Sequence, residues 1–309
     1  MTTLEEIRAA RATLAGPALA GDLEVLAALA AHGSVDALGH LADRAEDGNR
    51  PRTLPAWTSG ELVRGHAAAV ARQAARAGAR LVIPEDDEWP TTLPNLATAP
   101  AGQPRSGVLC LWVHGDPPVS TALQRAVAVV GARAATPYGT HVAEQLGYDL
   151  AAAGWTVVST GAYGVEGAPA RGALSGGGTV VAVLPAGVDR PYPPGHANLF
   201  DQIAARGLLV SPWPPGTTPT RTQFPVTSRL VATMAAGTVL VEATTRSTSL
   251  RALDQALTLG RPAMVVPGPV TSALSAGPLQ ALRTHRQARL VRGAADVIAA
   301  LIPPAEATD

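Results

Sequence analysis

The 309-residue sequence predicts an α/β protein whose main domain is a doubly wound, mostly parallel β-sheet. Two observations lead to this prediction. Short valine-rich runs recur from residue 108 onward, and segments with a helical spacing of apolar residues separate most of them. Strands that are apolar along their whole length are typical of parallel sheets covered by helices on both faces. Ligands bind such sheets beyond the carboxyl ends of the strands, so a site is expected in the strand-to-helix loops.

The first predicted element is a small N-terminal helical domain at residues 1–80. It is rich in alanine, and in LEVLAALAAHGSVDALGHLADRA the larger apolar residues recur at helical spacing. Gly33 and Ser34 indicate the end of one helix and the cap of the next. Residues 81–107 are dense in proline and glycine, and we expect a linker there that leads into the core. The core is predicted over residues 108–300, followed by a tail at 301–309.

The core is predicted to alternate strands with helices. Strands are expected at 108–113, 127–130, 155–159, 179–184, 208–211, 238–243, 263–267 and 288–291. Helices are expected at 138–154, 168–177, 197–207, 226–237, 249–260 and 277–285. This order is typical of consecutive βαβ units, in which the strands run parallel.

The composition excludes some functions and favours others. All 24 basic residues are arginine, so a P-loop lysine and a Schiff-base lysine are both excluded. The net charge of zero hides an asymmetry: residues 1–102 hold 9 arginines and 13 acidic residues, whereas residues 201–300 hold 10 arginines and 4 acidic residues. A basic half favours an anionic partner such as nucleic acid. Arginine from a GC-rich genome on a solvated surface explains the same asymmetry equally well.

Motifs of the common catalytic and metal sites are absent from the sequence. There is no G-x-S-x-G, H-E-x-x-H, C-x-x-C or G-x-G-x-x-G, and the seven histidines lack metal-site spacing. The single cysteine, Cys110, lies in an apolar run and is expected to be buried. The N-terminus lacks a signal pattern, and no apolar run approaches the roughly 20 residues that cross a bilayer. We expect a cytoplasmic protein without a metal, a cofactor or enzymatic activity, and without membrane contact.

The loop after VAVV (127–130) is the first candidate site. Gly131 ends the strand, Arg133 follows it, and Thr136 is a plausible N-cap with Pro137 in the first helical turn. A helix N-terminus beside a guanidinium can hold an anion, and a glycine lets a phosphate approach the backbone. A surface arginine beyond a glycine turn is the structural alternative.

The next strand-to-helix loop carries further candidates. Ser159 and Gly161, with Gly164 beyond them, offer hydroxyl and backbone N–H groups after the strand WTVVS. Tyr163 in the same loop either stacks on a ligand or packs under the loop.

Arginines also stand at the entry of later elements. Arg229 lies in the segment FPVTSR, and Arg246 follows the strand TVLVEA, where Ser247 could cap the next helix. Asp189 is interpreted mainly as loop architecture.

The order of these loops resembles the DNA-processing protein A (DprA, or Smf) family. The resemblance rests on V-G-x-R-x-x-x-x-Y-G, V-V-S before a glycine-rich loop and R-G-A-L, A-V-L-x-x-G-x-D-x-x-Y-P-P, F-P-x-x-x-R, V-x-V-E-A-x-x-x-S-x-S-L and V-P-G. It covers about residues 81–298. It implies a Rossmann-like core, binding of single-stranded DNA, loading of the RecA recombinase and a homodimer.

The residues that this resemblance implies are only partly kept. Those that match the family are Arg133, Asp189, Arg229, Glu242, Ser247, Ser249 and Gly268. Those that depart from it are Thr160, Tyr163, Glu166, Ala170, Thr227, Ser228, Thr248 and Ala252. Two basic positions are lost among them, so we expect weakened DNA binding, partly offset if Tyr163 stacks on a base.

Three functions therefore follow from the sequence. The first is a non-enzymatic single-stranded DNA-binding protein of DNA uptake or recombination. The second is a binder of a nucleotide-derived small molecule, or a phosphoribohydrolase-like enzyme, with Glu242 as the available acid. The third is a divergent paralogue that acts as a protein-interaction module.

Overall fold

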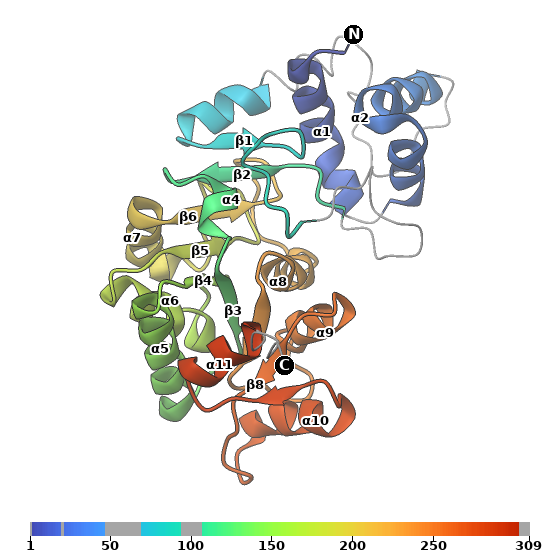
Figure 1. Ribbon diagram of the computed structural model, residues 1–309. Helices are drawn as coiled ribbons and strands as arrows, with labels where there is room; N and C mark the ends of the chain where they lie inside the picture. Colours follow the sequence, from blue (N-terminus) through green and yellow to red (C-terminus); the bar gives the residue numbers. More distant parts are fainter. Residues whose placement is uncertain (1, 20–21, 47–68, 94–106, 303–309) are drawn as a thin grey trace, which may run out of the picture. The chain divides into compact units, whose positions relative to one another are not determined.

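A computed structural model describes residues 2–19, 22–46, 69–93 and 107–302 (Figure 1). The chain divides into two compact units. The first comprises Met1–His114 together with Ala186–Arg190 and Val210–Thr218, and the second comprises the remainder. The first unit thus extends beyond the helical domain predicted at 1–80, and it includes two loops from the second half of the chain.

Among its described residues, the first unit contains α1 (Leu4–Leu19), α2 (Leu23–Glu46), a further helix at residues 69–76 and an antiparallel pair of strands. Helix α1 packs on α2, with Leu14 and Leu41 fully buried. Strand β1 (Arg80–Val82) pairs antiparallel with β2 (Leu111–His114). Strand β2 was expected from the sequence but β1 was not, because the three residues of β1 are too few to show a periodicity.

Helix α2 is interrupted at Gly33, as the sequence predicted. Gly33 has φ 75° and ψ 179°, a left-handed conformation that breaks the helical backbone. The segment Glu24–Arg44 nevertheless has the length and the mean hydropathy, 1.3, of a membrane-spanning helix, which the sequence analysis did not expect. Because the break leaves each half well short of the roughly 20 residues needed to span a bilayer, this segment is weak evidence for a membrane helix.

Residues 83–93 lie in the predicted linker but are held in place by ion pairs. Arg8 contacts Asp86, Arg11 contacts Glu85 at 2.5 Å, and Arg80 contacts Glu88 at 2.9 Å. Three acidic residues in four positions are thus each paired with an arginine of α1 or β1. The rest of the predicted linker, residues 94–106, lies outside the described residues.

The second unit is built on parallel strands, as predicted. The strands are β3 (Ala126–Val130), β4 (Thr156–Ser159), β5 (Val180–Val183), β7 (Gly237–Leu240), β8 (Ala263–Val265) and β9 (Arg289–Leu290). Their spatial order is β5-β4-β3-β7-β8-β9, and every pairing for which the register is given, from β5 to β9, is parallel. Strand β6 (Leu208–Ser211), in which the division between the units falls, is the neighbour of β5.

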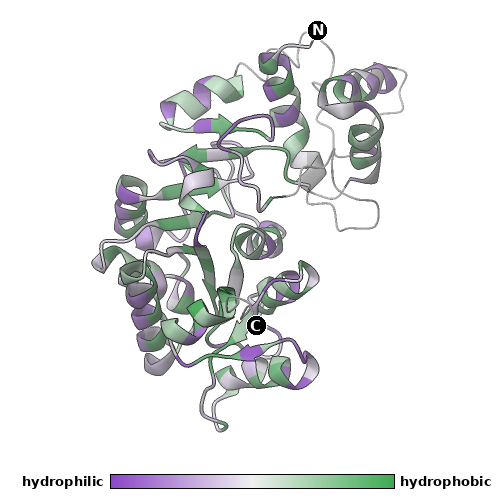
Figure 2. Ribbon diagram, in the orientation of Figure 1, coloured by the Kyte–Doolittle hydropathy of each residue, from purple (hydrophilic) through white to green (hydrophobic). Residues whose placement is uncertain are grey.

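Helices cover both faces of this sheet. They are α4 (Val119–Ala122), α5 (Pro137–Ala152), α6 (Ala168–Ser175), α7 (Ala197–Arg206), α8 (Gln223–Thr233), α9 (Leu250–Thr258), α10 (Ala276–Thr284) and α11 (Ala294–Leu301). In Figure 1, α5, α6 and α7 lie on one side of the strands, and α8, α9 and α10 lie on the other. The strands β3, β4, β5 and β7 are buried throughout and form an apolar layer (Figure 2). The doubly wound prediction is therefore confirmed, although α4 and α11 were not expected.

Two glycines let α5 and α6 pack with their backbones in contact. A Cβ atom on Gly147 would lie 2.1 Å from the carbonyl oxygen of Pro169, and one on Gly172 would lie 1.9 Å from that of Glu144. Neither carbonyl can move aside as the end of a flexible side chain would. The close helix pair therefore depends on glycine at both positions.

Candidate functional site

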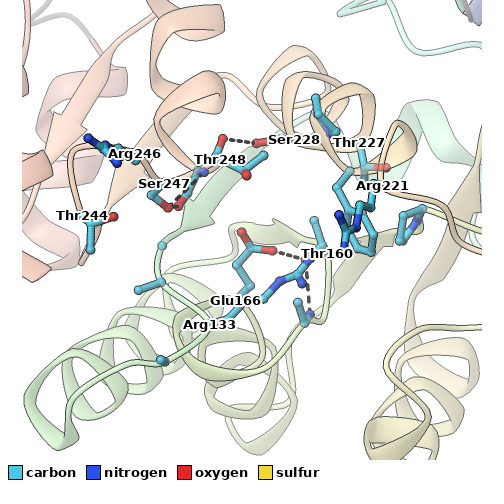
Figure 3. Close-up of a pocket in the computed structure, with 18 of the residues that line it drawn as sticks. Arg133, Thr160, Glu166, Arg221, Thr227, Ser228, Thr244, Arg246, Ser247 and Thr248 are labelled. Carbon is cyan, nitrogen blue, oxygen red and sulfur yellow. Dashed lines mark hydrogen bonds between the residues drawn. The ribbon is translucent and has the colours of Figure 1, made fainter.

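A cavity of about 510 Å³ opens at the carboxyl ends of the central strands (Figure 3). The loops after β3, β4, β5 and β7 and the first turns of α8 line it, and every lining residue belongs to the second unit. The loops of β4 and β7 meet there because these strands flank β3 on opposite sides. Ligands of parallel α/β sheets bind at such a switch point. The cavity, called the pocket below, thus lies where the sequence analysis expected a site.

Thr136 caps helix α5 and is tied to a buried carboxylate. Its hydroxyl accepts a hydrogen bond from the Gly139 N–H at 3.1 Å and donates one to Glu242 Oε1 at 2.6 Å. The Thr136 N–H donates to Glu242 Oε2 at 2.9 Å, and Glu242 is only 2% exposed. The predicted N-cap is confirmed. Neither Thr136 nor Glu242 lines the pocket, and both stabilise the structure around it.

Replacing Thr136 by valine is expected to lower the free energy of unfolding by about 1 to 2 kcal/mol. The change removes the cap and leaves the Glu242 carboxylate without one of its two donors. Chemical denaturation measures the difference. Thr140→Val is the matched control, because the Thr140 hydroxyl in the same helix makes no hydrogen bond within the described part of the chain. A loss of similar size in both variants would contradict this role of Thr136.

Arg133 lies in the pocket against an aromatic pair. Its guanidinium carbon is 4.5 Å from the centre of the Phe224 ring, and Phe224 meets Tyr192 edge to face at 5.6 Å. All three residues line the pocket. Gly131 lines it too, but a Cβ atom there would lie 2.6 Å from Val165 Cγ1. Packing inside the protein therefore already requires a glycine at this position.

Backbone hydrogen bonds join the loops that follow β3, β4 and β7. The Ala132 N–H donates to the Glu242 carbonyl at 2.6 Å, and the Val165 N–H donates to the Ala132 carbonyl at 3.0 Å. Gly164 has φ 68°, and a Cβ atom there would lie 2.3 Å from the carbonyl oxygen of Arg133. Gly164 thus serves the contact between two loops and does not line the pocket.

Glu166 is the acidic residue of the pocket. It is partly buried, and it accepts hydrogen bonds from the Thr160 hydroxyl and from the Gly131 N–H. Burial raises the pKa of Glu166 above its usual value, and three influences oppose the rise: the Thr160 hydrogen bond, the positive charge of Arg133 and the Gly131 hydrogen bond. Figure 3 shows Glu166 and Arg133 pointing into the same part of the pocket.

The remaining candidates of the β4 loop lie outside the pocket. Ser159 is fully buried and accepts a hydrogen bond from the Gly161 N–H at 3.2 Å. Gly161 has φ 66° and packs against Phe200. Tyr163 is 46% exposed and meets His196 edge to face at 4.7 Å. The ring of Tyr163 is therefore partly packed and partly free, between the two alternatives that the sequence left open.

The loop after β7 supplies hydroxyl groups and a cation. Arg246 and Ser247 line the pocket, and Figure 3 shows them on the far side of it from Arg221. Ser247 does not cap α9 as predicted, because the N-cap position is Ser249. The two serine hydroxyls are 2.6 Å apart and hydrogen bond to each other. This hydrogen bond therefore orients one serine hydroxyl relative to the other in the loop after β7.

The start of α8 brings in a cation that the sequence analysis missed. Arg221 lines the pocket, as do Thr227 and Ser228. Arg229, predicted to be a site residue, is exposed on α8 and does not line the pocket. Arg133 and Arg229 therefore do not converge on one cavity. Among the described residues, no ion pair involves Arg133, Arg221 or Arg246. Their charges are therefore available to a ligand.

The predicted site residues thus fall into two groups. Gly131, Arg133, Arg246 and Ser247 line the pocket, whereas Thr136, Ser159, Gly161, Tyr163, Gly164 and Arg229 do not. Within the described residues, no group of three or more histidine, cysteine, aspartate or glutamate side chains could hold a metal ion. Asp189, in the first unit, accepts two hydrogen bonds from the Gly216 N–H, at 2.7 and 2.9 Å, and serves loop architecture.

Fold and site together define a doubly wound α/β protein with a cationic pocket at the switch point of its sheet. Comparison with known proteins identifies the family. The sequence model of the DNA recombination-mediator protein A family matches residues 80–302, and the chain belongs to this family. The resemblance inferred from the motifs is therefore confirmed.

Several relatives are DNA processing proteins. A DprA-type protein of Mycobacterium tuberculosis is 44% identical over 226 residues, which are 72% of this chain and 58% of the relative. DprA of Bacillus subtilis is 30% identical over 53% of this chain and 55% of the relative, and DprA of Streptococcus pneumoniae is 34% identical over 56% and 60%. The matched region thus spans less than two thirds of these relatives.

Solved structures confirm the fold. The crystal structure of Streptococcus pneumoniae DprA has a TM-score of 0.73 at 24% identity, and the match covers 97% of this chain and 98% of that chain. DNA processing protein A of Helicobacter pylori has a TM-score of 0.59 at 24% identity, covering 71% and 94%. The latter structure was described for its single-stranded DNA binding mode.

Proposed function

We propose that this protein binds single-stranded DNA in DNA processing and recombination, without catalysing a reaction. The observation that carries this proposal is the pocket itself, in which Arg133, Arg221 and Arg246 surround one cavity and have no ion-pair partner among described residues. Three unpaired guanidinium groups favour a polyanion. Membership of the recombination-mediator family and the Helicobacter pylori relative support DNA as that polyanion.

The remaining lining residues suit a flexible strand. Hydroxyl groups of Ser247, Thr248 and Thr244 are donors for phosphate oxygens, and they lie beside Arg246 (Figure 3). Phe224 and Tyr192 offer apolar ring surface to an unstacked base. No histidine or cysteine is among the residues that line the pocket.

RecA and a second copy of the chain are the proposed protein partners. Both rest on family membership, since relatives in this family are DNA processing proteins and the family is described as a recombination mediator. Cross-linking mass spectrometry with RecA on oligonucleotide, and sedimentation without it, test the two partners separately.

Salt-dependent binding is the direct test of the proposed function. Fluorescence anisotropy of labelled oligo-dT is expected to show an affinity whose logarithm falls with the logarithm of salt concentration, by about 0.7 for each phosphate contact. Three arginine contacts give a slope of about −2 by this relation. A slope of zero, or no binding at low salt, would overturn the proposal and favour a protein-interaction module.

Binding is also expected to strengthen as the pH falls. Burial raises the pKa of Glu166 above 4.5, and a phosphate bound in the pocket would raise it further through its negative charge. Binding then takes up a proton, so affinity for oligo-dT rises as the pH falls through the folded-state pKa and levels off below it. Glu166→Gln should bind like the protonated form and lose this part of the pH dependence. Identical pH profiles for the two proteins would contradict the prediction.

A further inference from the structure

Glu166 stands out in the pocket because it is an acceptor where the other charged groups are donors. Arg133, Arg221 and Arg246 suit phosphates, whereas a carboxylate repels them. An ionised carboxylate has two oxygens with about four lone-pair sites and no proton to donate. Thr160 and the Gly131 N–H occupy two of these sites. About two acceptor positions of Glu166, which lines the pocket, are left for other donors.

The neighbours of Glu166 are suited to the flat part of a nucleotide. Arg133 lies beside Glu166 in Figure 3 and is stacked on Phe224, and Phe224 contacts Tyr192. Bases stack on aromatic rings and on guanidinium planes. The cavity of about 510 Å³ is in the size range of small-molecule pockets, so a single base has room within it.

The loop after β7 is suited to phosphate. Arg246, Ser247 and Thr248 come from this loop, and the Arg246 side chain extends away from Glu166 in Figure 3. A nucleotide entering the pocket would therefore place its phosphate by this loop and turn its base edge toward Glu166. The four bases then differ in how well the donors and acceptors on their edges pair with a carboxylate.

Guanine alone among the four DNA bases presents two adjacent donors on its Watson–Crick edge, the N1–H and the N2 amino group. Adenine and cytosine each place a ring-nitrogen acceptor next to one amino group, and thymine places one N–H between two carbonyl acceptors. An acceptor that faces the carboxylate is repelled, whereas two parallel donors form a bidentate pair.

We propose that Glu166 makes the pocket selective for guanine, so that a guanine within single-stranded DNA is held by its N1–H and N2 amino group. This inference rests on the proposed function for its natural ligand, although the pocket contacts it invokes apply equally to a free guanine nucleotide. Contacts with the phosphate backbone of DNA carry no base preference, and the contact with Glu166 would add one.

The first test uses labelled dT strands with one central substitution by deoxyguanosine, deoxyinosine or deoxyadenosine. Inosine keeps the N1–H of guanine and lacks only the N2 amino group. The strand with guanine is expected to bind about tenfold more tightly than the strand with inosine, as for other bidentate base contacts. Equal affinity of the three strands for the wild-type protein would overturn the inference while leaving single-strand binding intact.

Glu166→Gln supplies the matching change in the protein. The amide offers the base a donor in place of one acceptor, so the preference for guanine over inosine should disappear. Glu144→Gln is the control, because it removes an exposed carboxylate that does not line the pocket. Loss of the preference in the control, or its persistence in Glu166→Gln, would show that Glu166 is not the residue that reads the base.

A thermal-shift measurement with free dGMP and dIMP separates this inference from the proposed function. If no strand binds but dGMP raises the melting temperature more than dIMP does, single-strand binding fails and guanine selectivity is supported. If strands bind but neither they nor the nucleotides discriminate, the proposed function is kept and the selectivity is overturned. If neither strands nor nucleotides bind, both are overturned.

Discussion

Replacement of Arg133 by alanine is expected to weaken binding of oligo-dT by about tenfold or more and to reduce the salt slope by about 0.7. Arg133 is exposed in the pocket, has no ion-pair partner in the described residues and is held over Phe224. Because the ring holds the guanidinium in place, a phosphate contact costs little side-chain freedom. Fluorescence anisotropy at several salt concentrations measures both quantities.

Arg229→Ala is the matched control for this experiment. It removes the same charge from an exposed site on α8 that does not line the pocket. We expect a small loss of affinity and a salt slope close to that of the wild type. Equal losses in the two variants would mean that net charge, not the pocket, drives binding. The binding surface would then have to include Arg229, as the motif analysis predicted.

Replacement of Gly147 by alanine is expected to lower the free energy of unfolding by about 3 kcal/mol, at the upper end of usual overpacking penalties. The new methyl group would lie 2.1 Å from the Pro169 carbonyl oxygen, so α5 and α6 must separate. For a unit of this size, such a loss corresponds to a fall in melting temperature of about 9 °C. Differential scanning calorimetry measures the shift.

Gly39→Ala provides the opposite expectation in a comparable setting. Gly39 is exposed within α2, and a Cβ atom there would meet nothing within 4 Å. Alanine is a better helix former than glycine by up to about 1 kcal/mol, so this variant should be unchanged or more stable. If Gly147→Ala behaved like Gly39→Ala, the close backbone contact between α5 and α6 would be contradicted.

The strands and helices of the second unit could be predicted because local patterns determine them. Valine-rich runs marked β3, β4 and β5 to within a residue or two at each end, and Thr136 and Pro137 marked the start of α5. The position of the pocket followed as well, because parallel strands place all their carboxyl ends at one edge. Strand β9 was also expected, at 288–291, whereas the three-residue strand β1 was not, since so few residues show no period.

Only some of the residues that line the pocket could be predicted from the sequence. Arg221 and Arg229 lie eight positions apart near the same helix, yet only Arg221 lines the cavity. Which side of a helix faces a cavity depends on how the helix packs, and the motif F-P-x-x-x-R does not encode that. Glu166 was visible only as a departure from the family pattern, because its significance depends on Arg133 and Thr160 from the same region of space.

The hydrogen bonds that join Ala132 to Glu242 and Val165 to Ala132 link the loops after β3, β4 and β7 to one another. A ligand that enters the pocket therefore finds much of its wall already in place and orders few backbone torsions on binding. That saving in conformational entropy is expected to favour binding of a ligand. Because these hydrogen bonds link the loops, a substitution that shifts the backbone of one loop is also expected to shift the other two.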